Sequence, residues 1–312
     1  MNYKAPNTED WKGRPSSQHD YLYQRIECLN LNNLKEVIHP TFGIVGYAVD
    51  EGVRRNQGRV GASEGPQSFR TSFGKLANHF DASVQLLDLG EIQCIDQNLE
   101  QTQEYLAETV YSILSKGIKP VIIGGGHDIA YGHFKGIQKA YPNKSIGIVN
   151  FDAHLDLRPF EQGAHSGSPF NQIASEVDDF HYLCIGYRKN ANPPYLIKRA
   201  RELQVELIER EYSTTQHLSQ VFKSLNSFSK KVDLLYITID LDGFADCYAP
   251  GVSAPSPLGF DVDFSLACVK HLMSKGKVIS VDLAELNPAF DIDSRTSKLA
   301  AALTYHIIDS WK

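Results

Sequence analysis

The chain has 312 residues, a formal net charge of −6 and 22% charged residues, and large α/β sheets of this length still fold as one domain. It has no Lys/Arg cluster of the kind that follows a phosphate backbone, so nucleic acid is not an expected partner. No apolar stretch approaches the roughly 20 residues that cross a bilayer, and the start of the chain lacks an apolar signal core. We therefore expect a cytoplasmic protein without a membrane partner. The five cysteines are scattered, odd in number and without Cys-x-x-Cys spacing, so neither a disulfide framework nor a thiolate metal site is indicated.

The predicted elements alternate between strand and helix after a polar first segment, which we expect to form loops and short helices around the domain. Strands are predicted at 43–49 and 86–89 and near residues 121, 146, 182, 206, 234 and 278, and helices at 98–116, 194–202, 216–225, 264–274 and 295–308. Such alternation implies right-handed crossovers and a mostly parallel sheet with helices on both faces. Ligands of these sheets bind beyond the carboxyl ends of the strands.

Three motifs rich in Asp and His lie where apolar runs end. They read Gly-Gly-Gly-His-Asp at 124–128, Asp-Ala-His-Leu-Asp at 152–156 and Asp-Leu-Asp at 240–242. Taken alone, His127 would be a hydrogen-bonded core histidine and Asp128 the N-cap of a helix that starts at the next residue. Together, the motifs supply two imidazoles and four carboxylates besides Asp128, which is enough for two metal ions.

The ligand types indicate which metal and which chemistry to expect. In an extended chain, Asp152 and His154 point to the same side, and Asp240 and Asp242 repeat that spacing. Four clustered carboxylates would have raised pKa values without a cation, and two divalent ions would balance their charge. Nitrogen and oxygen ligands without thiolate favour Mn²⁺, although Zn²⁺, Co²⁺ and Ni²⁺ compete by affinity. A water held between two such ions becomes a nucleophile, which predicts hydrolysis.

The three motifs, in this order and spacing, resemble those of the ureohydrolase superfamily (arginase, agmatinase and formimidoylglutamase). The resemblance runs from about Val45 to Ile308. It implies an α/β fold, a three-layer α/β/α sandwich around a mostly parallel sheet of about eight strands, with two Mn²⁺ per subunit. By this resemblance the first manganese is held by His127, Asp152, Asp156 and Asp240, and the second by Asp152, His154, Asp240 and Asp242, with Asp152 and Asp240 bridging.

Two further segments resemble catalytic parts of the family. Segment 278–288 is similar to the strand whose glutamate binds the cationic amidine or guanidine group, and Glu285 is the match. Segment 165–170 aligns with the loop that carries a catalytic His before Gly in arginase and agmatinase. That place is Ser166 here, and His165, one residue away, would project to the other side of an extended loop. The resemblance implies Asp156 and Glu285 as catalytic residues, with His165 as a candidate helper and Ser166 as a candidate substrate contact.

Stretches 50–62 and 249–255, and Arg158 two residues after Asp156, are similar to the formimidoylglutamase subgroup. This similarity predicts a hydrolase of the histidine-degradation pathway that cleaves N-formimidoyl-L-glutamate to L-glutamate and formamide by attack of metal-bound hydroxide on the formimino carbon. Arginine suits bidentate carboxylate binding, so Arg158 is the candidate for the glutamate end. The other candidates are Arg54, Arg55 and Arg59. For each of the four arginines, a structural salt bridge is the alternative role.

The same motifs are compatible with other functions. An agmatinase or guanidinobutyrase would share the metals and release urea, and a non-catalytic binding protein could use the same scaffold. A zinc deacetylase is more remote, because such sites use fewer carboxylates. We expect an N-terminal wrapping segment at 1–40 and a single catalytic domain at 41–312. The expected partner is a small-molecule substrate, and the resemblance also implies a homo-oligomer.

Overall fold

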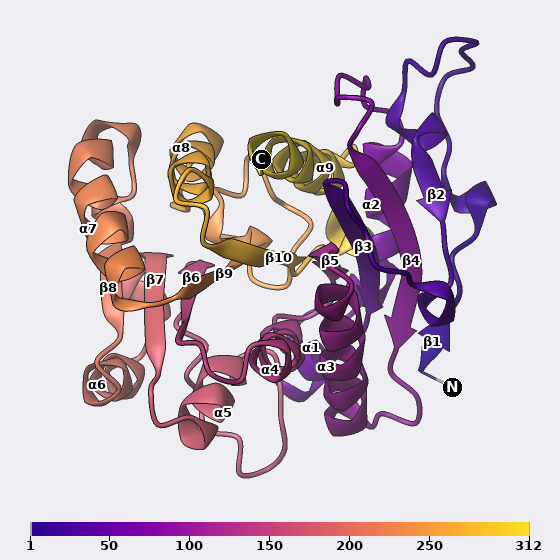
Figure 1. Ribbon diagram of the computed structural model, residues 1–312. Coiled ribbons are helices and arrows are strands. Elements are labelled where there is room, and N and C mark those ends of the chain that lie inside the picture. Colours follow the sequence, from indigo (N-terminus) through magenta and orange to yellow (C-terminus); the bar gives the residue numbers. More distant parts are fainter. Residues whose placement is uncertain (1, 312) are drawn as a thin grey trace.

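The fold is built on one central sheet in a computed structural model, of which residues 2–311 are described. Within these residues the sheet has ten strands in the order β1-β4-β3-β5-β10-β9-β6-β7-β8, and β2 pairs with β4 (Figure 1). The strands are β1 (Tyr3–Lys4), β2 (Ile26–Cys28), β3 (Thr41–Ala48), β4 (Gln85–Gln93), β5 (Lys119–Gly124), β6 (Ile146–Phe151), β7 (His181–Tyr187), β8 (Glu206–Glu209), β9 (Leu234–Asp240) and β10 (Val278–Ala284). Every pairing is parallel except that of β1 with β4.

Helices cover both faces of the sheet and make the three layers visible in Figure 1. Helices α2, α7, α8 and α9 lie on one face, and α3, α4, α5 and α6 lie on the other. The helices are α1 (Glu51–Arg55), α2 (Gly65–Phe73), α3 (Leu99–Ser115), α4 (Ile129–Ala140), α5 (Pro169–Glu176), α6 (Pro194–Glu202), α7 (Leu218–Lys231), α8 (Val262–Met273) and α9 (Arg295–Ser310), with short 3-10 turns between some of them. This arrangement confirms the predicted α/β/α sandwich.

The apolar strand sequences are explained by burial on both faces. In β6, Val149 and Phe151 pack into the core layer of α7 and α8, whereas Ile148 packs into the opposite layer with α4 and α5. All three side chains are fully buried, and burial of such a side chain contributes about 1.5–3 kcal/mol.

The first forty residues do more than surround the domain, because β1 and β2 extend the sheet beyond β4. The predicted loops and short helices are therefore only part of this segment. The strands from Thr41 onward are the eight parallel strands that the sequence predicts. The division at residue 40 stays a prediction, and its outer limits, residues 1 and 312, lie outside the described residues.

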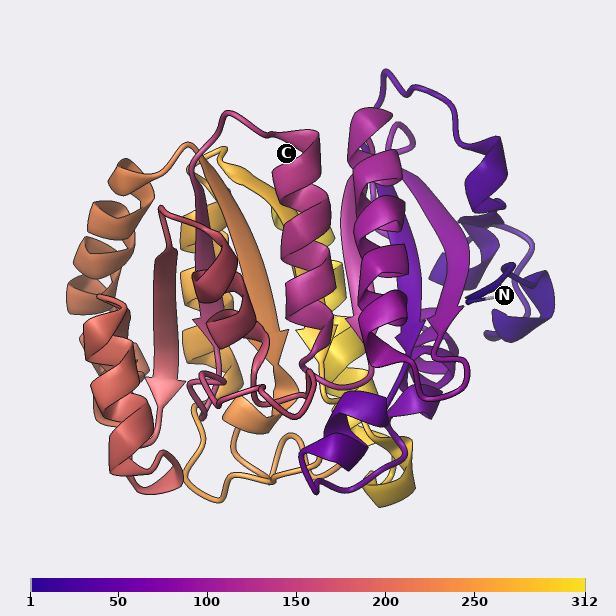
Figure 2. The ribbon, with the colours of Figure 1, turned by 90° about the horizontal axis from the view of Figure 1, so that it is seen from below.

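The parallel strands direct their carboxyl ends to one edge of the sheet, where α1 also lies (Figure 2). The motifs follow β5, β6 and β9, and Glu285 follows β10. These four strands are neighbours in the order β5-β10-β9-β6, so residues distant in sequence meet at the centre of that edge. None of the described helices combines the length and the apolar character that a membrane crossing needs.

Candidate metal centre

The imidazole of His127 lies at the centre of a group of carboxylates. Its Nδ1 atom is 3.2 Å from Asp152 Oδ2, 2.9 Å from Asp156 Oδ2 and 3.0 Å from Asp240 Oδ2. These four side chains form one group with metal-ligand spacing. The strand ends thus bring together all four residues predicted for the first metal.

A second group shares Asp152 with the first and adds His154 and Asp242. His154 Nδ1 lies 3.2 Å from Asp242 Oδ2 and 3.5 Å from Asp152 Oδ1. Asp240 belongs to the first group only, so its bridging role stays a prediction.

Turns hold the pairs Asp152/His154 and Asp240/Asp242. This corrects the extended geometry that the sequence predicted for them. β6 ends at Phe151, and Asp152 Oδ1 accepts a hydrogen bond from the backbone N–H of His154 at 2.7 Å. In the same way Asp240 Oδ1 accepts from the N–H of Asp242 at 2.8 Å, where a 3-10 turn follows β9. Asp side chains commonly fold back on the backbone in this way, and here the turn points both members of each pair toward the centre.

Close backbone packing explains the glycines before His127. A Cβ on Gly125 would lie 1.7 Å from the carbonyl oxygen of Val49, so a side chain there would displace the loop. Two residues of the centre, Asp156 and Glu285, adopt left-handed backbone angles with φ of 47° and 67°. Such conformations are costly for residues other than glycine and concentrate at functional sites.

Electrostatics show that the group carries excess negative charge. Burial lowers the pKa of His127 and of His154, but the neighbouring carboxylates outweigh burial and hold both values well above normal. Burial raises the pKa of Asp156, Asp240 and Asp242, and nearby carboxylates raise them further. The expectation of raised values is wrong for Asp152, whose pKa is lowered despite burial, because both imidazoles interact with its carboxylate.

Unsatisfied polar atoms indicate that cations fit this centre. Within the described part of the chain, His127 Nδ1 and Asp242 Oδ1 are buried without a well-directed hydrogen bond. Buried polar atoms of this kind need a partner, and a divalent ion satisfies an imidazole nitrogen and carboxylate oxygens together. The donor set contains no cysteine, as the sequence predicts.

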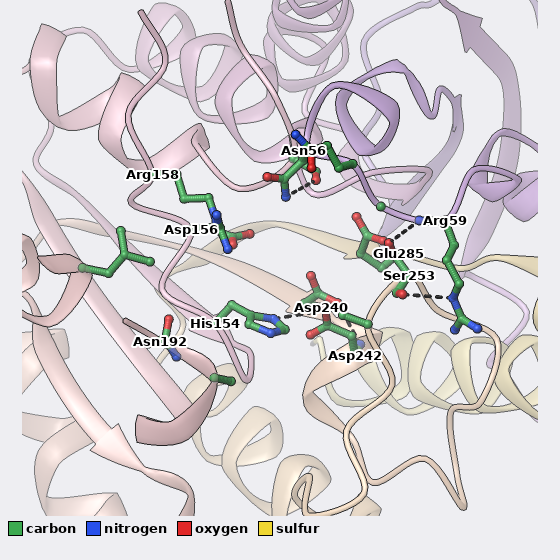
Figure 3. Close-up of a pocket in the computed structure, with 16 residues that line it drawn as sticks. Asn56, Arg59, His154, Asp156, Arg158, Asn192, Asp240, Asp242, Ser253 and Glu285 are labelled. Carbon is green, nitrogen blue, oxygen red and sulfur yellow. Dashed lines mark hydrogen bonds and ion pairs between the residues drawn. The ribbon is translucent and has the colours of Figure 1, made fainter. Parts of the chain in front are cut away.

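The centre opens into a cavity of about 300 Å³ (Figure 3). The lining includes ligand candidates from both groups together with Glu285, Arg158, Ser166 and Asn56. Glu285 Oε1 accepts a hydrogen bond from the backbone N–H of His127 at 3.0 Å, and its Oε2 is buried without a partner among residues 2–311. Burial first, and then the charges of Asp240 and Asp242, raise its pKa well above normal.

The four candidate arginines separate by their partners. Arg54 and Arg55 pair with Glu51, and Arg55 also pairs with Glu100. Arg59 donates to the carbonyl oxygens of Val252 and Ser253 and points away from the centre in Figure 3. Arg158 alone of the four has a guanidinium without a hydrogen bond or ion pair to the described residues, and it extends toward the cavity (Figure 3). Arg59 nevertheless lines the cavity, so its predicted contact with the substrate stays a prediction.

The structure separates His165 from Ser166. Ser166 lines the cavity and accepts a hydrogen bond from Asn56 Nδ2 at 3.1 Å. His165 lines a neighbouring cavity instead, and its ring nitrogens meet backbone groups of Pro159 and Gly167. The proposed helper His165 is thus not brought to the carboxylates, because adjacent residues of the loop face different cavities.

Sequence reasoning gave Asp128 a capping role and overlooked Asn192. Asp128 sits at the N-terminus of α4, but its side chain caps no helical N–H and accepts from Tyr47 Oη at 2.7 Å. Asn192 accepts from the N–H of Leu155 and donates to the carbonyl oxygen of Ala153, so it holds the loop on both sides of His154. An isolated Asn carries no sequence motif that would have revealed this contact.

The fold and the paired His/Asp groups define an α/β protein with a buried centre that can hold two metal ions. A family model described as the arginase family matches residues 40–309. The chain belongs to this family, which confirms the resemblance to the ureohydrolases.

Similar proteins cover almost the whole chain. The formimidoylglutamase of Geobacillus thermodenitrificans (strain NG80-2) is 38% identical over 305 residues, which are 96% of this chain and 95% of the relative. That of Legionella pneumophila (strain Paris) is 38% identical over 317 residues, 99% of this chain and 98% of the relative.

Solved structures share the fold. The crystal structure of Trypanosoma cruzi formiminoglutamase with Mn²⁺ has a TM-score of 0.78 at 25% identity and covers 87% of this chain and 93% of its own. Formimidoylglutamase from Bacillus subtilis, at 23% identity, has a TM-score of 0.84 and covers 95% of this chain and 93% of its own, which supports the fold.

Proposed function

We propose that this protein is a formimidoylglutamase, a hydrolase that converts N-formimidoyl-L-glutamate and water to L-glutamate and formamide in histidine degradation. One observation carries the substrate assignment. The same cavity contains a buried acidic oxygen without a partner, Glu285 Oε2, and a guanidinium without a partner among the described residues, Arg158. A substrate with an amidine-like cation at one end and two carboxylates at the other complements both groups. The relatives named formimidoylglutamase support the same reading.

The proposed cofactor is a pair of Mn²⁺ ions, as in the Trypanosoma cruzi formiminoglutamase. When bound, the pair supplies Lewis-acid activation of a water molecule beside a planar carbon. We assign His127, Asp152, Asp156 and Asp240 to the first ion, and Asp152, His154, Asp240 and Asp242 to the second. The spacing of the two groups supports every ligand of this assignment except Asp240 at the second ion, which rests on the family resemblance.

The protein's own residues bind and orient the substrate. Glu285 accepts hydrogen bonds from the formimidoyl nitrogens, and the N–H of His127 fixes the other oxygen of that carboxylate. Arg158 binds the glutamate carboxylates in a bidentate manner, and Ser166 contacts the chain between the two ends. Asp156 accepts a hydrogen bond from the attacking water and passes a proton to the departing amino nitrogen. The oxygen of water thereby joins the formimino carbon, the bond from that carbon to the glutamate nitrogen breaks, and formamide leaves.

Of the alternative ureohydrolase substrates, agmatine fits the cavity less well, whereas guanidinobutyrate carries both a cation and a carboxylate and is distinguished by its product, urea. Agmatine is a dication, so one of its charges would face Arg158 without a carboxylate to balance it. A purely binding function would leave the ligand set and the unpartnered Glu285 oxygen without a use.

The test is product release by Mn²⁺-reconstituted protein given N-formimidoyl-L-glutamate, arginine, agmatine and guanidinobutyrate in parallel. Formamide from the first substrate alone is the expected result. Urea from any other substrate would refute the substrate assignment and keep the metal chemistry, and no turnover by protein with two bound ions would favour the binding function. The cytoplasmic location and the homo-oligomer stay predictions, which cell fractionation and solution mass measurement would test.

A further inference from the structure

A chain of buried polar groups lies beneath His127, on the side of the ring that faces away from the carboxylates. His127 Nε2 lies 2.9 Å from Thr238 Oγ1, and the Thr238 hydroxyl lies 2.6 Å from Asp282 Oδ1. Thr238 and Asp282 belong to the central strands β9 and β10 and are fully buried. The proposed reaction uses neither residue, so their polar side chains in the middle of apolar strands need another explanation.

The second oxygen of Asp282 also receives donors. His133 Nδ1 lies 2.6 Å from Asp282 Oδ2, and Tyr236 Oη donates to the same oxygen. His133 reaches Ser280 through its other ring nitrogen and packs against the Tyr236 ring at 4.5 Å between centroids. Both oxygens of Asp282 therefore accept hydrogen bonds, Oδ1 from the Thr238 hydroxyl and Oδ2 from the Tyr236 hydroxyl.

This acceptor fixes the direction of the whole chain. The Thr238 hydroxyl has one proton and donates it in a hydrogen bond to Asp282, so the Thr238 oxygen must accept a hydrogen bond from His127. The donor is then Nε2–H, and the lone pair of the neutral imidazole resides on Nδ1. Nδ1 is the atom that faces Asp152, Asp156 and Asp240.

We propose that Asp282 is a positioning residue that acts through Thr238 to fix the tautomer and the ring orientation of His127, so that Nδ1 is the atom presented to the first metal ion. The inference rests on the proposed two-metal site. Partners of the non-ligating nitrogen generally control ligand basicity and orientation. Here the partner is a hydroxyl whose own direction is set by a carboxylate on the neighbouring strand.

The decisive variant is Asp282→Asn, which keeps the shape of the side chain. Its amide nitrogen can donate to Thr238, and the Thr238 hydroxyl would then donate to His127 Nε2, which leaves the proton on Nδ1. We expect Mn²⁺ affinity at the His127 site to fall by about 10- to 100-fold, the usual effect of losing such a partner. The His154 site, which has no contact with this chain of groups, should keep its affinity.

A second pair of variants tests the inference independently, in case Asp282→Asn does not fold. Thr238→Ser keeps the hydroxyl and should bind both ions like the wild type, whereas Thr238→Val removes it and should weaken the His127 site alone. Thr304→Val removes another fully buried threonine hydroxyl, on α9, and serves as the matched control. Thermal unfolding of each metal-free protein checks that the fold is retained.

The measurement is a Mn²⁺ titration that follows free Mn²⁺ by electron paramagnetic resonance and resolves two binding steps. Wild-type affinity for both ions in Asp282→Asn and Thr238→Val would overturn the inference, and so would equal weakening of both steps, which indicates general loosening. Fewer than two bound ions in the wild-type protein would instead refute the proposed function, on which the inference depends.

Discussion

Arg158 offers the sharpest test of how the substrate is oriented. Its guanidinium has no ion pair or hydrogen bond to residues 2–311, although it borders the cavity beside Asp156. Replacement by alanine therefore removes a substrate contact without leaving an unpaired protein charge. A hydrogen bond to a charged group contributes about 1.5–3 kcal/mol. Because Arg158 is solvent-exposed, screening favours the lower part of that range, about 1.5–2 kcal/mol.

At about 1.4 kcal/mol for each tenfold change, Arg158→Ala should raise KM for N-formimidoyl-L-glutamate by about 10- to 30-fold. The kcat should stay near the wild-type value, because the guanidinium binds the end of the substrate that does not react. Steady-state formamide release measures both parameters. A formamidine with an alkyl chain in place of the glutamate carboxylates should be hydrolysed equally by both proteins.

Two matched variants complete this test. Arg158→Lys keeps the charge and loses the bidentate geometry, so its KM should lie between those of the wild type and the alanine variant. Arg54→Ala removes an arginine that is already paired with Glu51 at 2.6 Å and should leave KM unchanged. An unchanged KM in Arg158→Ala would refute the proposed anchor, and a raised KM in Arg54→Ala would move it to that residue.

Four further predictions follow from the centre and its surroundings. Asp152→Asn should lose both bound metal ions and nearly all turnover, since Asp152 belongs to both ligand groups; elemental analysis showing two ions per chain would contradict this. Glu285→Gln should lower kcat/KM by on the order of 100-fold, because a charge-assisted hydrogen bond of about 3 kcal/mol is lost, while the number of bound Mn²⁺ ions stays at the wild-type value. Gly167→Ala should raise KM with little change in thermal midpoint, because the new Cβ would lie 2.8 Å from Arg158 Cδ and displace that side chain; an unchanged KM would show that the side chain adapts. In metal-free protein the raised pKa of His127 means that the folded state retains a proton that the unfolded chain loses above about pH 6.5, so the urea midpoint should fall as the pH rises from about 6 to about 8. Mn²⁺ competes with protons and should oppose this trend, and a midpoint that rises with pH in chelator would refute the charge analysis.

Much of the fold was predictable because the parallel strands are buried on both faces. Apolar runs such as 146–151 and 234–240 have no other stable environment, and α3 and α9 show their apolar spacing clearly. The short helices α1, α2 and α5 were not predicted. In α2, for example, Arg70 is buried because Asp88 and Glu91 of β4 pair with it, and such a contact cannot be inferred from local sequence.

The candidate site was also predictable only in part. Its proposed metal ligands stand in short motifs at strand ends, where a charged residue after an apolar run is visible in the sequence. The direction in which the Arg59 guanidinium points depends on hydrogen bonds to the carbonyl oxygens of Val252 and Ser253. These residues are almost two hundred positions away in the sequence. The loop-holding role of Asn192 depends likewise on the path of the backbone. Only the folded chain determines which polar groups are left free to meet a substrate.

The position of β10 has a consequence for how the protein is made. β10 spans Val278–Ala284 and is the last strand of the chain, yet it lies between β5 and β9 in the middle of the sheet. During synthesis all the other strands leave the ribosome before β10. The half of the sheet that ends at β5 and the half that begins at β9 are not joined by strand pairing until β10 enters between them. A nascent chain that lacks β10 cannot align the motif after β5 with that after β9, so the His127 group cannot assemble before β10 is in place. Such dependence on contacts distant in sequence slows folding and exposes unpaired strand edges meanwhile.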